Sequence, residues 1–255
     1  MTTLLRTVDL RREFGELVAV DGVSLDIVHG EITCIIGPNG AGKTTFYDLL
    51  TGMVEPTSGE VWLRHDGELQ EITGLPAHEI ADRGLARSFQ IIEIFERLTV
   101  RQNVQVACVA RNDRTLDLTT WLDADEAINE QVDEILELTG LTHLAGKRCS
   151  TLSYGQQRNV EISLALAIES SVVLLDEPTA GLNPTDSAIV VDFVNELDER
   201  TDTTFVVTEH DMDVVFNIAD RIVVLHDGRV IADGDPGTVR ADETVTEAYL
   251  GGSSI

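Results

Sequence analysis

The stretch GPNGAGKTT, residues 37–45, decides the fold, because an apolar run at 32–36 leads into it and a helical pattern leaves it. It fits the pattern G-x-x-x-x-G-K-[ST], which is typical of a loop that wraps around phosphate groups. In such a loop the glycines allow close backbone approach, so successive N–H groups and the N-terminus of the next helix converge on phosphate oxygens. Taken alone, the stretch also fits a plain glycine-rich turn between a strand and a helix.

Two side chains of this stretch carry chemistry of their own. Lys43 would reach the β- and γ-phosphates of a nucleotide, and Thr44 would offer its hydroxyl to Mg²⁺. The remaining residues are expected to bind nucleotide as parts of the same loop: Gly37, Pro38, Asn39, Gly40, Ala41, Gly42 and Thr45.

The composition excludes several classes of protein. A hydrophobic content of 43% over 255 residues excludes wholesale disorder. No apolar run approaches the roughly 20 residues that span a bilayer, and the N-terminus has no signal-peptide pattern, so we expect a soluble, intracellular protein. The widely separated cysteines Cys34, Cys108 and Cys149 favour structural thiols over disulfides or a zinc cluster.

The net charge of −27, from 18 basic and 45 acidic residues, argues against binding to nucleic acid backbones. Lys43 and Lys147 are the two lysines, and the acidic residues are spread along the chain. This composition resembles the acidic, lysine-poor proteins of salt-in halophiles. The alternative is an acidic protein from a mesophile, in which self-repulsion on this scale would be unfavourable without screening.

The N-terminal residues predict a small antiparallel sheet. Strand-type runs at 4–10 and 17–28 flank a turn at 13–16. Phe14 lies in this turn, where an exposed ring could stack on adenine with Val20 packed beside it. Phe14 fits the structural role of a turn anchor equally well.

After the loop, the pattern changes from strands to helices. A helix is expected from Lys43 to Thr51, a strand at 60–64, and a strand-type run at 84–90 that ends in Gln90. Helical periodicity at 100–110 and 127–138 then predicts a helical lobe, residues 91–158, inserted into an α/β core of residues 1–90 and 159–255. Taken alone, Gln90 is simply a solvated strand end.

The last helix of this lobe has a clear start signal. Ser153 and Gln156 have the spacing of a capping box in the sequence LSYGQ, residues 152–156. By itself this spacing indicates a well-capped helix and nothing more.

Two later strands end in charged residues. The apolar run 172–175 is followed by Asp176 and Glu177, and two carboxylates at the end of a buried strand are unfavourable unless they serve a cation or a reaction. With the phosphate loop upstream, Asp176 becomes the acid on the Mg²⁺ side and Glu177 the candidate general base for water. His210 follows the run 205–208; it is either a structural histidine or part of the same ligand-binding edge.

Together these motifs resemble those of the nucleotide-binding subunits of ABC transporters, over nearly the whole chain. Walker A is residues 37–45, the Q-loop glutamine is Gln90, the signature is 152–156, Walker B is 172–176 with Glu177 after it, and the switch histidine is His210. Tyr154 in the signature, Asn183 in the D-loop, and the stretches 209–212 and 248–251 are similar to ATPases of branched-chain amino acid importers. Urea-importer and lipopolysaccharide-export ATPases are the neighbouring groups.

The resemblance implies a P-loop ATPase core with a small antiparallel β subdomain and an inserted helical lobe, and ATP and Mg²⁺ as cofactors. It implies a head-to-tail pair in which Ser153, Gly155 and Gln156 of one subunit contact the ATP held by the loop of the other. Glu177, His210 and Gln90 would be catalytic. The metal would be served by Thr44, Gln90 and Asp176.

The resemblance also implies partners at the cytoplasmic face of the membrane: permease subunits, a second ATPase that is an identical copy or, as the resemblance favours, a paralogue, and indirectly a solute-binding protein. Residues 91–104 would line the groove for a permease helix, although Ile91, Ile92, Ile94 and Phe95 could instead fill the core. A non-transport ABC ATPase would carry tandem cassettes, a coiled coil or a basic surface, and the sequence has none. A non-catalytic cassette would lack Glu177 or His210, and both are present.

Overall fold

A computed structural model of the protein describes residues 2–88, 94–111 and 126–250. The chain forms two compact units. The first contains residues 1–87, 171–177 and 202–255, and the second contains residues 88–170 and 178–201. The second unit is therefore larger than the predicted lobe at 91–158, because it also takes in residues 159–170 and 178–201.

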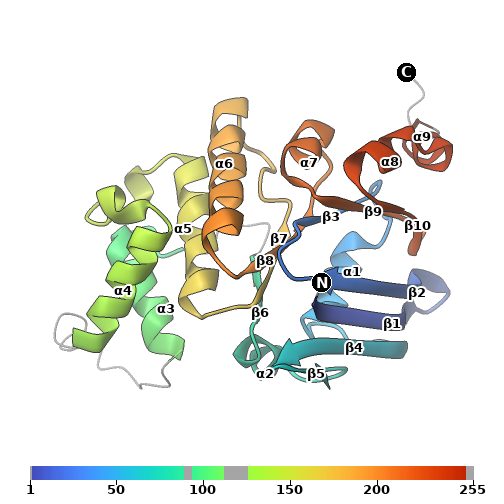
Figure 1. Ribbon diagram of the computed structural model, residues 1–255, viewed down its shortest axis with the longest axis horizontal. Coiled ribbons are helices and arrows are strands. Elements are labelled where there is room, and N and C mark those ends of the chain that lie inside the picture. Colours follow the sequence, from blue (N-terminus) through green and yellow to red (C-terminus); the bar gives the residue numbers. More distant parts are fainter. Residues whose placement is uncertain (1, 89–93, 112–125, 251–255) are drawn as a thin grey trace. The chain divides into compact units, whose positions relative to one another are not determined.

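One sheet of the first unit is antiparallel, with strand order β2-β1-β4-β5 (Figure 1). Its strands are β1 (Thr3–Phe14), β2 (Leu17–Val28), β4 (Ser58–His65) and β5 (Glu68–Glu71). The first three correspond to the predicted runs. The sequence analysis missed β5, because its side chains are exposed or half-buried and carry no apolar alternation.

The other sheet has the order β10-β9-β3-β8-β7-β6. Its strands are β3 (Thr33–Ile36), β6 (Leu85–Ser88), β7 (Val172–Asp176), β8 (Thr204–Thr208), β9 (Arg221–His226) and β10 (Arg229–Gly234). The central strands β9, β3, β8 and β7 are parallel, and β10 pairs antiparallel with β9. Every residue of β3, β7 and β8 is buried, which explains their continuous apolar sequences.

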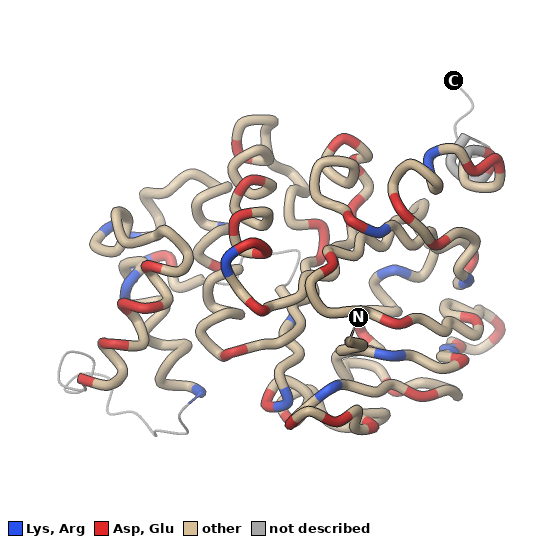
Figure 2. The backbone as a smooth tube through the Cα atoms, viewed as in Figure 1, with Lys and Arg blue, Asp and Glu red and all other residues tan. Residues whose placement is uncertain are grey.

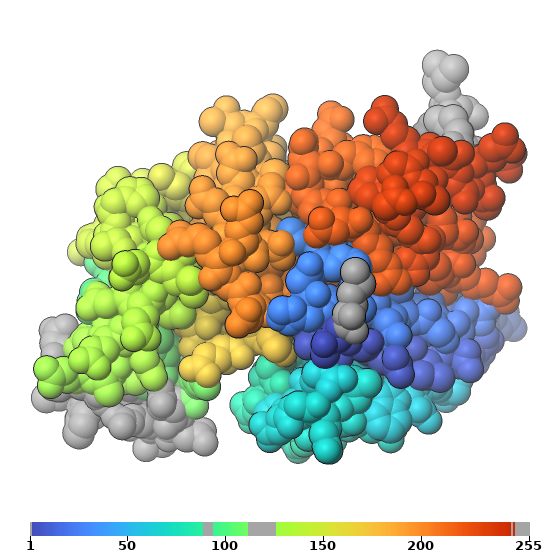
Figure 3. All heavy atoms as spheres, in the orientation of Figure 1, coloured from blue at the N-terminus to red at the C-terminus, as the bar shows by residue number. Residues whose placement is uncertain are grey.

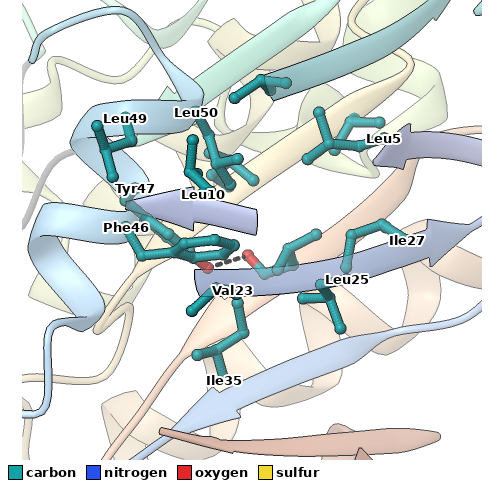
Figure 4. Packing of buried hydrophobic residues seen from close by; sticks show 14 of the residues in the cluster. Leu5, Leu10, Val23, Leu25, Ile27, Ile35, Phe46, Tyr47, Leu49 and Leu50 are labelled. Atoms are coloured by element: carbon teal, nitrogen blue, oxygen red, sulfur yellow. Dashed lines mark hydrogen bonds between the residues drawn. The ribbon is translucent and has the colours of Figure 1, made fainter. Parts of the chain in front are cut away.

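The core of the first unit gathers around α1 (Lys43–Leu50), which follows the loop at 37–42. Figure 4 shows Phe46 and Tyr47 of this helix among apolar side chains of β1, β2 and β3. Tyr47 is fully buried, and its hydroxyl donates to the carbonyl of Val206, 2.8 Å away. This bond ties α1 to β8 and so fixes the helix whose first residue is Lys43.

Shorter helices complete the first unit. They are α2 (Ala77–Asp82), α7 (Met212–Ile218), α8 (Pro236–Ala241) and α9 (Glu243–Leu250). The last two contact β10 and each other, and their red atoms lie together in Figure 3.

The second unit is helical, as the change in periodicity predicted. It contains α3 (Val100–Arg111), α4 (Glu126–Leu138), α5 (Tyr154–Ala167) and α6 (Pro184–Arg200), with short 3₁₀ turns at Leu141–Leu144 and Cys149–Thr151. Helix α5 packs against α3, α4 and α6, so that even Arg158 and Glu161 are buried, where they pair at 2.7 Å. The packing of α5 on α6 explains why residues 178–201 belong to this unit.

The structure shows where the acidic residues and the three cysteines lie. Figure 2 shows Asp and Glu residues on the helices and strands of both units. Cys34, Cys108 and Cys149 are buried as thiols, and none of the three is joined in a disulfide. No helix in the described part of the chain has both the length and the apolar character needed to cross a membrane.

Candidate functional site

The backbone of the loop at 37–42 requires glycine at two positions. Gly42 has a φ of 102°, and a Cβ atom there would lie 2.3 Å from the carbonyl oxygen of Ala19. A Cβ atom on Gly37 would lie 2.2 Å from the carbonyl oxygen of Leu225. Backbone atoms cannot yield as a flexible side chain can, so any larger residue would displace the loop. The loop therefore keeps its shape through contacts with both β2 and β9.

Lys43 lies over the loop that precedes it. Its ammonium donates to the carbonyl oxygens of Gly37, at 2.6 Å, and Pro38, at 3.3 Å. Burial lowers the pKa of Lys43, and the nearby carboxylates of Glu177 and Asp176 oppose that shift. A strong anion placed against the loop would offer this ammonium a better acceptor than two neutral carbonyls.

The other loop residues differ in exposure. Asn39, Gly40 and Thr44 are exposed, Pro38 and Thr45 are half-buried, and Ala41 is buried. The exposed hydroxyl of Thr44 is available to a ligand, and it follows Lys43 on the first turn of α1. This arrangement matches a phosphate-binding loop at a helix N-terminus.

Asp176 ends β7, and its carboxylate is held on both sides. Asp176 pairs with Thr208 in the parallel register of β7 and β8, and the Thr208 hydroxyl donates to Oδ1 at 2.8 Å. Arg87 donates to Oδ2 at 2.7 Å. The orientation of the carboxylate is thus set before any cation binds.

Arg87 is a site residue that the sequence analysis missed. Its guanidinium also donates to Asp48 of α1 at 2.6 Å, and it lies 5.5 Å from the centre of the Tyr47 ring. Burial alone would lower the pKa of Arg87, but the hydrogen bonds with Asp48 and Asp176 outweigh it and raise this pKa. A signal for it did exist, since an arginine that directly follows the apolar Leu85 and Ala86 in a strand needs a buried partner.

Glu177 has an uncommon backbone conformation, with a φ of 46°. Its N–H donates to the carbonyl oxygen of Thr208 at 3.0 Å, which holds it beside the end of β8. His210 follows β8, and its Nδ1 lies 3.8 Å from Glu177 Oε1. The His210 side chain is 60% exposed, which favours the ligand-binding alternative over that of a packed structural histidine. Strained residues of this kind cluster at functional sites.

The two residues predicted to contact adenine, Phe14 and Val20, differ in exposure. Phe14 is 46% exposed, and the guanidinium of Arg12 lies 4.5 Å from the centre of its ring. Val20, which was predicted to pack beside this ring and to help bind the nucleotide, is 1% exposed and packs in the core. The β1–β2 register shifts between the pairs Leu10–Val23 and Arg12–Val20, so Val20 and Val23 both point inward despite odd spacing.

The signature residues lie in the second unit, at the start of α5. Ser153 caps the helix by accepting from the N–H of Gln156 at 3.3 Å, and the Gln156 side chain accepts from the N–H of Ser153 at 3.2 Å. The predicted capping box is confirmed. The neighbouring Tyr154 side chain is 68% exposed, and a Cβ atom on Gly155 would lie 2.8 Å from the carbonyl oxygen of Asp186.

The segment after β6 is described only in part. Gln90, Ile91 and Ile92 lie outside the described residues. Ile94 is half-buried, whereas Phe95 is 57% exposed, so the alternative in which all four apolar residues fill the core is wrong for Phe95.

Comparison with known proteins identifies the family. Residues 20–180, more than half of the chain, match the family described as ABC transporter. The chain belongs to the ABC transporter family. Residues 229–254 of the cassette also match the family described as branched-chain amino acid ATP-binding cassette transporter. ATP hydrolysis is the general activity of such cassettes, so the predicted class of enzyme is confirmed.

The similarity of the cassette to individual proteins extends over nearly its whole length. It is 38% identical to the high-affinity branched-chain amino acid transport ATP-binding protein BraF of Pseudomonas aeruginosa, over 97% of this chain and 98% of BraF. The ADP conformation of an ATP-binding cassette of an ABC transporter superposes with a TM-score of 0.84 and 32% identity, over 98% of this chain and all of the other. A dimeric post-hydrolysis cassette bound to ADP and Pi gives a TM-score of 0.70 at 27% identity, over 91% and 98%. The predicted ATPase fold is confirmed.

Proposed function

We propose that this cassette is the ATP-hydrolysing subunit of an importer for branched-chain amino acids. The observation that carries the proposal is the match of residues 229–254 to the branched-chain amino acid cassette family. This segment includes all of β10, α8 and α9, outside the region that the general ABC transporter family matches. The name of the relative BraF supports the same solute class.

The phosphates of ATP bind in the loop at 37–45 in this proposal. Lys43 exchanges the carbonyl oxygens of Gly37 and Pro38 for β- and γ-phosphate oxygens, and its charge makes that exchange favourable. The exposed Phe14 ring stacks on the adenine, either on the face opposite Arg12 or after displacing it. Val20 supports β2 from within the core and takes no direct part.

Thr44 and Asp176 fit a magnesium site. Both offer hard oxygen atoms, which Mg²⁺ prefers, and the Asp176 carboxylate is already oriented by Thr208 and Arg87. Gln90 is the third residue assigned to the metal on sequence grounds. When bound, Mg²⁺ neutralises charge on the β- and γ-phosphates.

Glu177 is the proposed general base. Its backbone is fixed by Thr208, so its carboxylate projects from the end of β7 beside His210. There it would polarise a water molecule for in-line attack on the γ-phosphoryl group, while His210 donates to a γ-phosphate oxygen. Gln90 would sense the metal and the water and link them to the helical unit.

Two cassettes would each complete the ATP site of the other. The dimeric cassette among the structural neighbours supports a pair in which Ser153, Gly155 and Gln156 contact the ATP held by the partner. The capped N-terminus of α5 is suited to this role because a helix N-terminus attracts anions. The second cassette is an identical copy or a paralogue.

The permeases would bind at residues 91–104, where the exposed ring of Phe95 offers an apolar contact. This places the cassette at the cytoplasmic face of the membrane, with an extracytoplasmic solute-binding protein acting through the permeases.

The proposal is tested in vesicles that contain the cassette, the two permeases encoded beside it and their solute-binding protein. We expect leucine, isoleucine or valine to stimulate ATP hydrolysis and to accumulate inside the vesicles. Stimulation by urea alone, or movement of a lipid outward, would contradict the solute assignment. The Glu177→Gln variant is the control, because it keeps the assembly intact without hydrolysis.

A further inference from the structure

The hydroxyl of Ser153 has a hydrogen-bond partner within its own chain. Its Oγ donates to Oδ1 of Asp186, 2.7 Å away on the first turn of α6. Its other contact is the N–H of Gln156, from which it accepts. A serine hydroxyl has one proton to donate, and here it is donated to the carboxylate of Asp186.

The position of Asp186 is tightly fixed. The residue is 8% exposed, and its Oδ2 accepts from the side-chain amide of Asn183 at 2.8 Å. The Asn183 side-chain oxygen accepts in turn from the N–H of Asp186 at 3.0 Å. Gly155 packs against the same residue, since a Cβ atom there would lie 3.0 Å from Asp186 Oδ1. The signature and the start of α6 therefore meet at one carboxylate.

This contact has a consequence for ATP binding, which rests on the proposed role of Ser153 toward the partner's γ-phosphate. A γ-phosphate oxygen can receive the Ser153 proton only if Asp186 gives it up. The carboxylate is also an anion, so a second anion at the same hydroxyl is repelled. Asn183 and Gln156 do not neutralise this charge, because both side chains are neutral.

We propose that Asp186 competes with the γ-phosphate of ATP for the hydroxyl of Ser153, and so opposes closure of the cassette pair until ATP is bound. Asp186 is a positioning residue and touches no nucleotide. It holds the Ser153 side chain in one orientation in the open state. It also makes closure depend on an acceptor strong enough to replace a carboxylate.

The Asp186→Asn variant distinguishes competition for the Ser153 proton from a role in which Asp186 only holds the Ser153 side chain in place. Its side-chain oxygen can still accept from Asn183, while its NH₂ group faces Ser153 Oγ and donates to it. The Ser153 proton is then available to the phosphate, and one negative charge is gone. In the full-length Glu177→Gln background, the ATP concentration that gives half-maximal dimer should fall about three- to tenfold, the worth of one hydrogen bond.

Three controls define this result. Asp192→Asn removes an exposed charge from the same helix and should leave the ATP dependence unchanged. In a Ser153→Ala background, Asp186→Asn should lower the ATP requirement much less, because the contested hydroxyl is absent and only the charge changes. In the nucleotide-free chain, the Ser153→Ala and Asp186→Asn substitutions should couple in melting temperature, which tests the hydrogen bond without any dimer.

Each outcome is decisive for the proposal. An unchanged or raised ATP requirement in a folded Asp186→Asn chain would overturn the competition while leaving the proposed pairing intact. A fall of equal size in the Ser153→Ala background would show that charge alone acts, which also overturns it. Absence of an ATP-dependent dimer in every variant, including Glu177→Gln alone, would overturn the pairing in the proposed function and the competition with it.

Discussion

Arg87 and Asp176 form a nearly buried ion pair, with 2.7 Å between Nη2 and Oδ2 and side chains that are 7% and 11% exposed. Through its second amino group Arg87 also pairs with Asp48 of α1. One guanidinium thus links β6, the first helix after the loop at 37–42, and the carboxylate at the end of β7. The planar, forked shape of arginine suits this double role.

Replacement of Arg87 by methionine should destabilise the cassette by about 3 kcal/mol, because it leaves two partly buried carboxylates without their cation. Arg87→Lys should restore only part of this loss, since one ammonium cannot span both carboxylates as the guanidinium does. Urea unfolding measures both. The control is Arg83→Met, whose half-exposed pair with Glu79 should be worth about 1 kcal/mol or less. Equal losses for the two arginines would contradict the structural role of Arg87.

Replacement of Glu177 by glutamine should keep ATP binding and slow hydrolysis by about a hundredfold or more, because the general base is lost. Lys43→Ala should instead lose nucleotide affinity. Both are measured by nucleotide titration and by phosphate release. The matched control is Glu196→Gln, which removes an exposed carboxylate from α6 and should hydrolyse ATP normally. Hydrolysis by Glu177→Gln at the wild-type rate would show that the base is another group.

Replacement of Phe95 by aspartate should uncouple ATP hydrolysis from transport in reconstituted vesicles and leave nucleotide binding by the isolated chain intact. The exposed ring contributes little to the core, so the melting temperature should hardly change. Met53→Asp is the control, because Met53 is also 57% exposed but lies outside residues 91–104. A large loss of stability in Phe95→Asp would favour a role in the core.

Potassium chloride should raise both the melting temperature and the ATPase activity between about 0.1 M and molar concentrations. The Debye length falls from about 30 Å at 0.01 M to about 3 Å at 1 M, so repulsion within a chain of net charge −27 is screened. Sulfate salts stabilise proteins by exclusion alone and would not discriminate. A flat or falling melting temperature in KCl would contradict the halophilic interpretation and leave the ATPase assignment untouched.

The stability of the cassette should decrease as pH rises above 9, in part because of Cys108. Burial raises the pKa of this thiol from 9.0 to about 11, so the thiol of the unfolded chain ionises first. Its contribution is complete below pH 9 and is lost as pH rises toward 11, with about 1 kcal/mol gone at pH 10. Urea unfolding at several pH values should therefore give a shallower slope for Cys108→Ala. Parallel curves for the two proteins would contradict this cause.

The sequence was most informative where the residues of one short segment alone determine the local structure. The buried strands β7 and β8 were predictable because every side chain in them is buried, and the capping box because its partners are three residues apart. The burial of Val20 was not predictable, because the register shift between β1 and β2 interrupts the two-residue alternation. No local pattern marks such a shift in advance.

Arg87 and Asp186 were missed for a different reason. Their partners are distant in the chain: Asp176 lies 89 residues from Arg87, and Ser153 lies 33 residues from Asp186. In the sequence Asp186 is an ordinary acidic residue on the first turn of a helix. Its second role becomes visible only when α5 and α6 are packed together.

The left-handed backbone of Glu177 implies a conflict between folding and activity. A glutamate in this region is strained by about 1 kcal/mol or more, and the proline that follows restricts it further. Glycine has no such strain, so Glu177→Gly is expected to make the cassette harder to unfold while abolishing its chemistry. Selection for stability alone would favour glycine at this position, so the strain at the end of β7 is a cost that the proposed general base imposes on the folded chain.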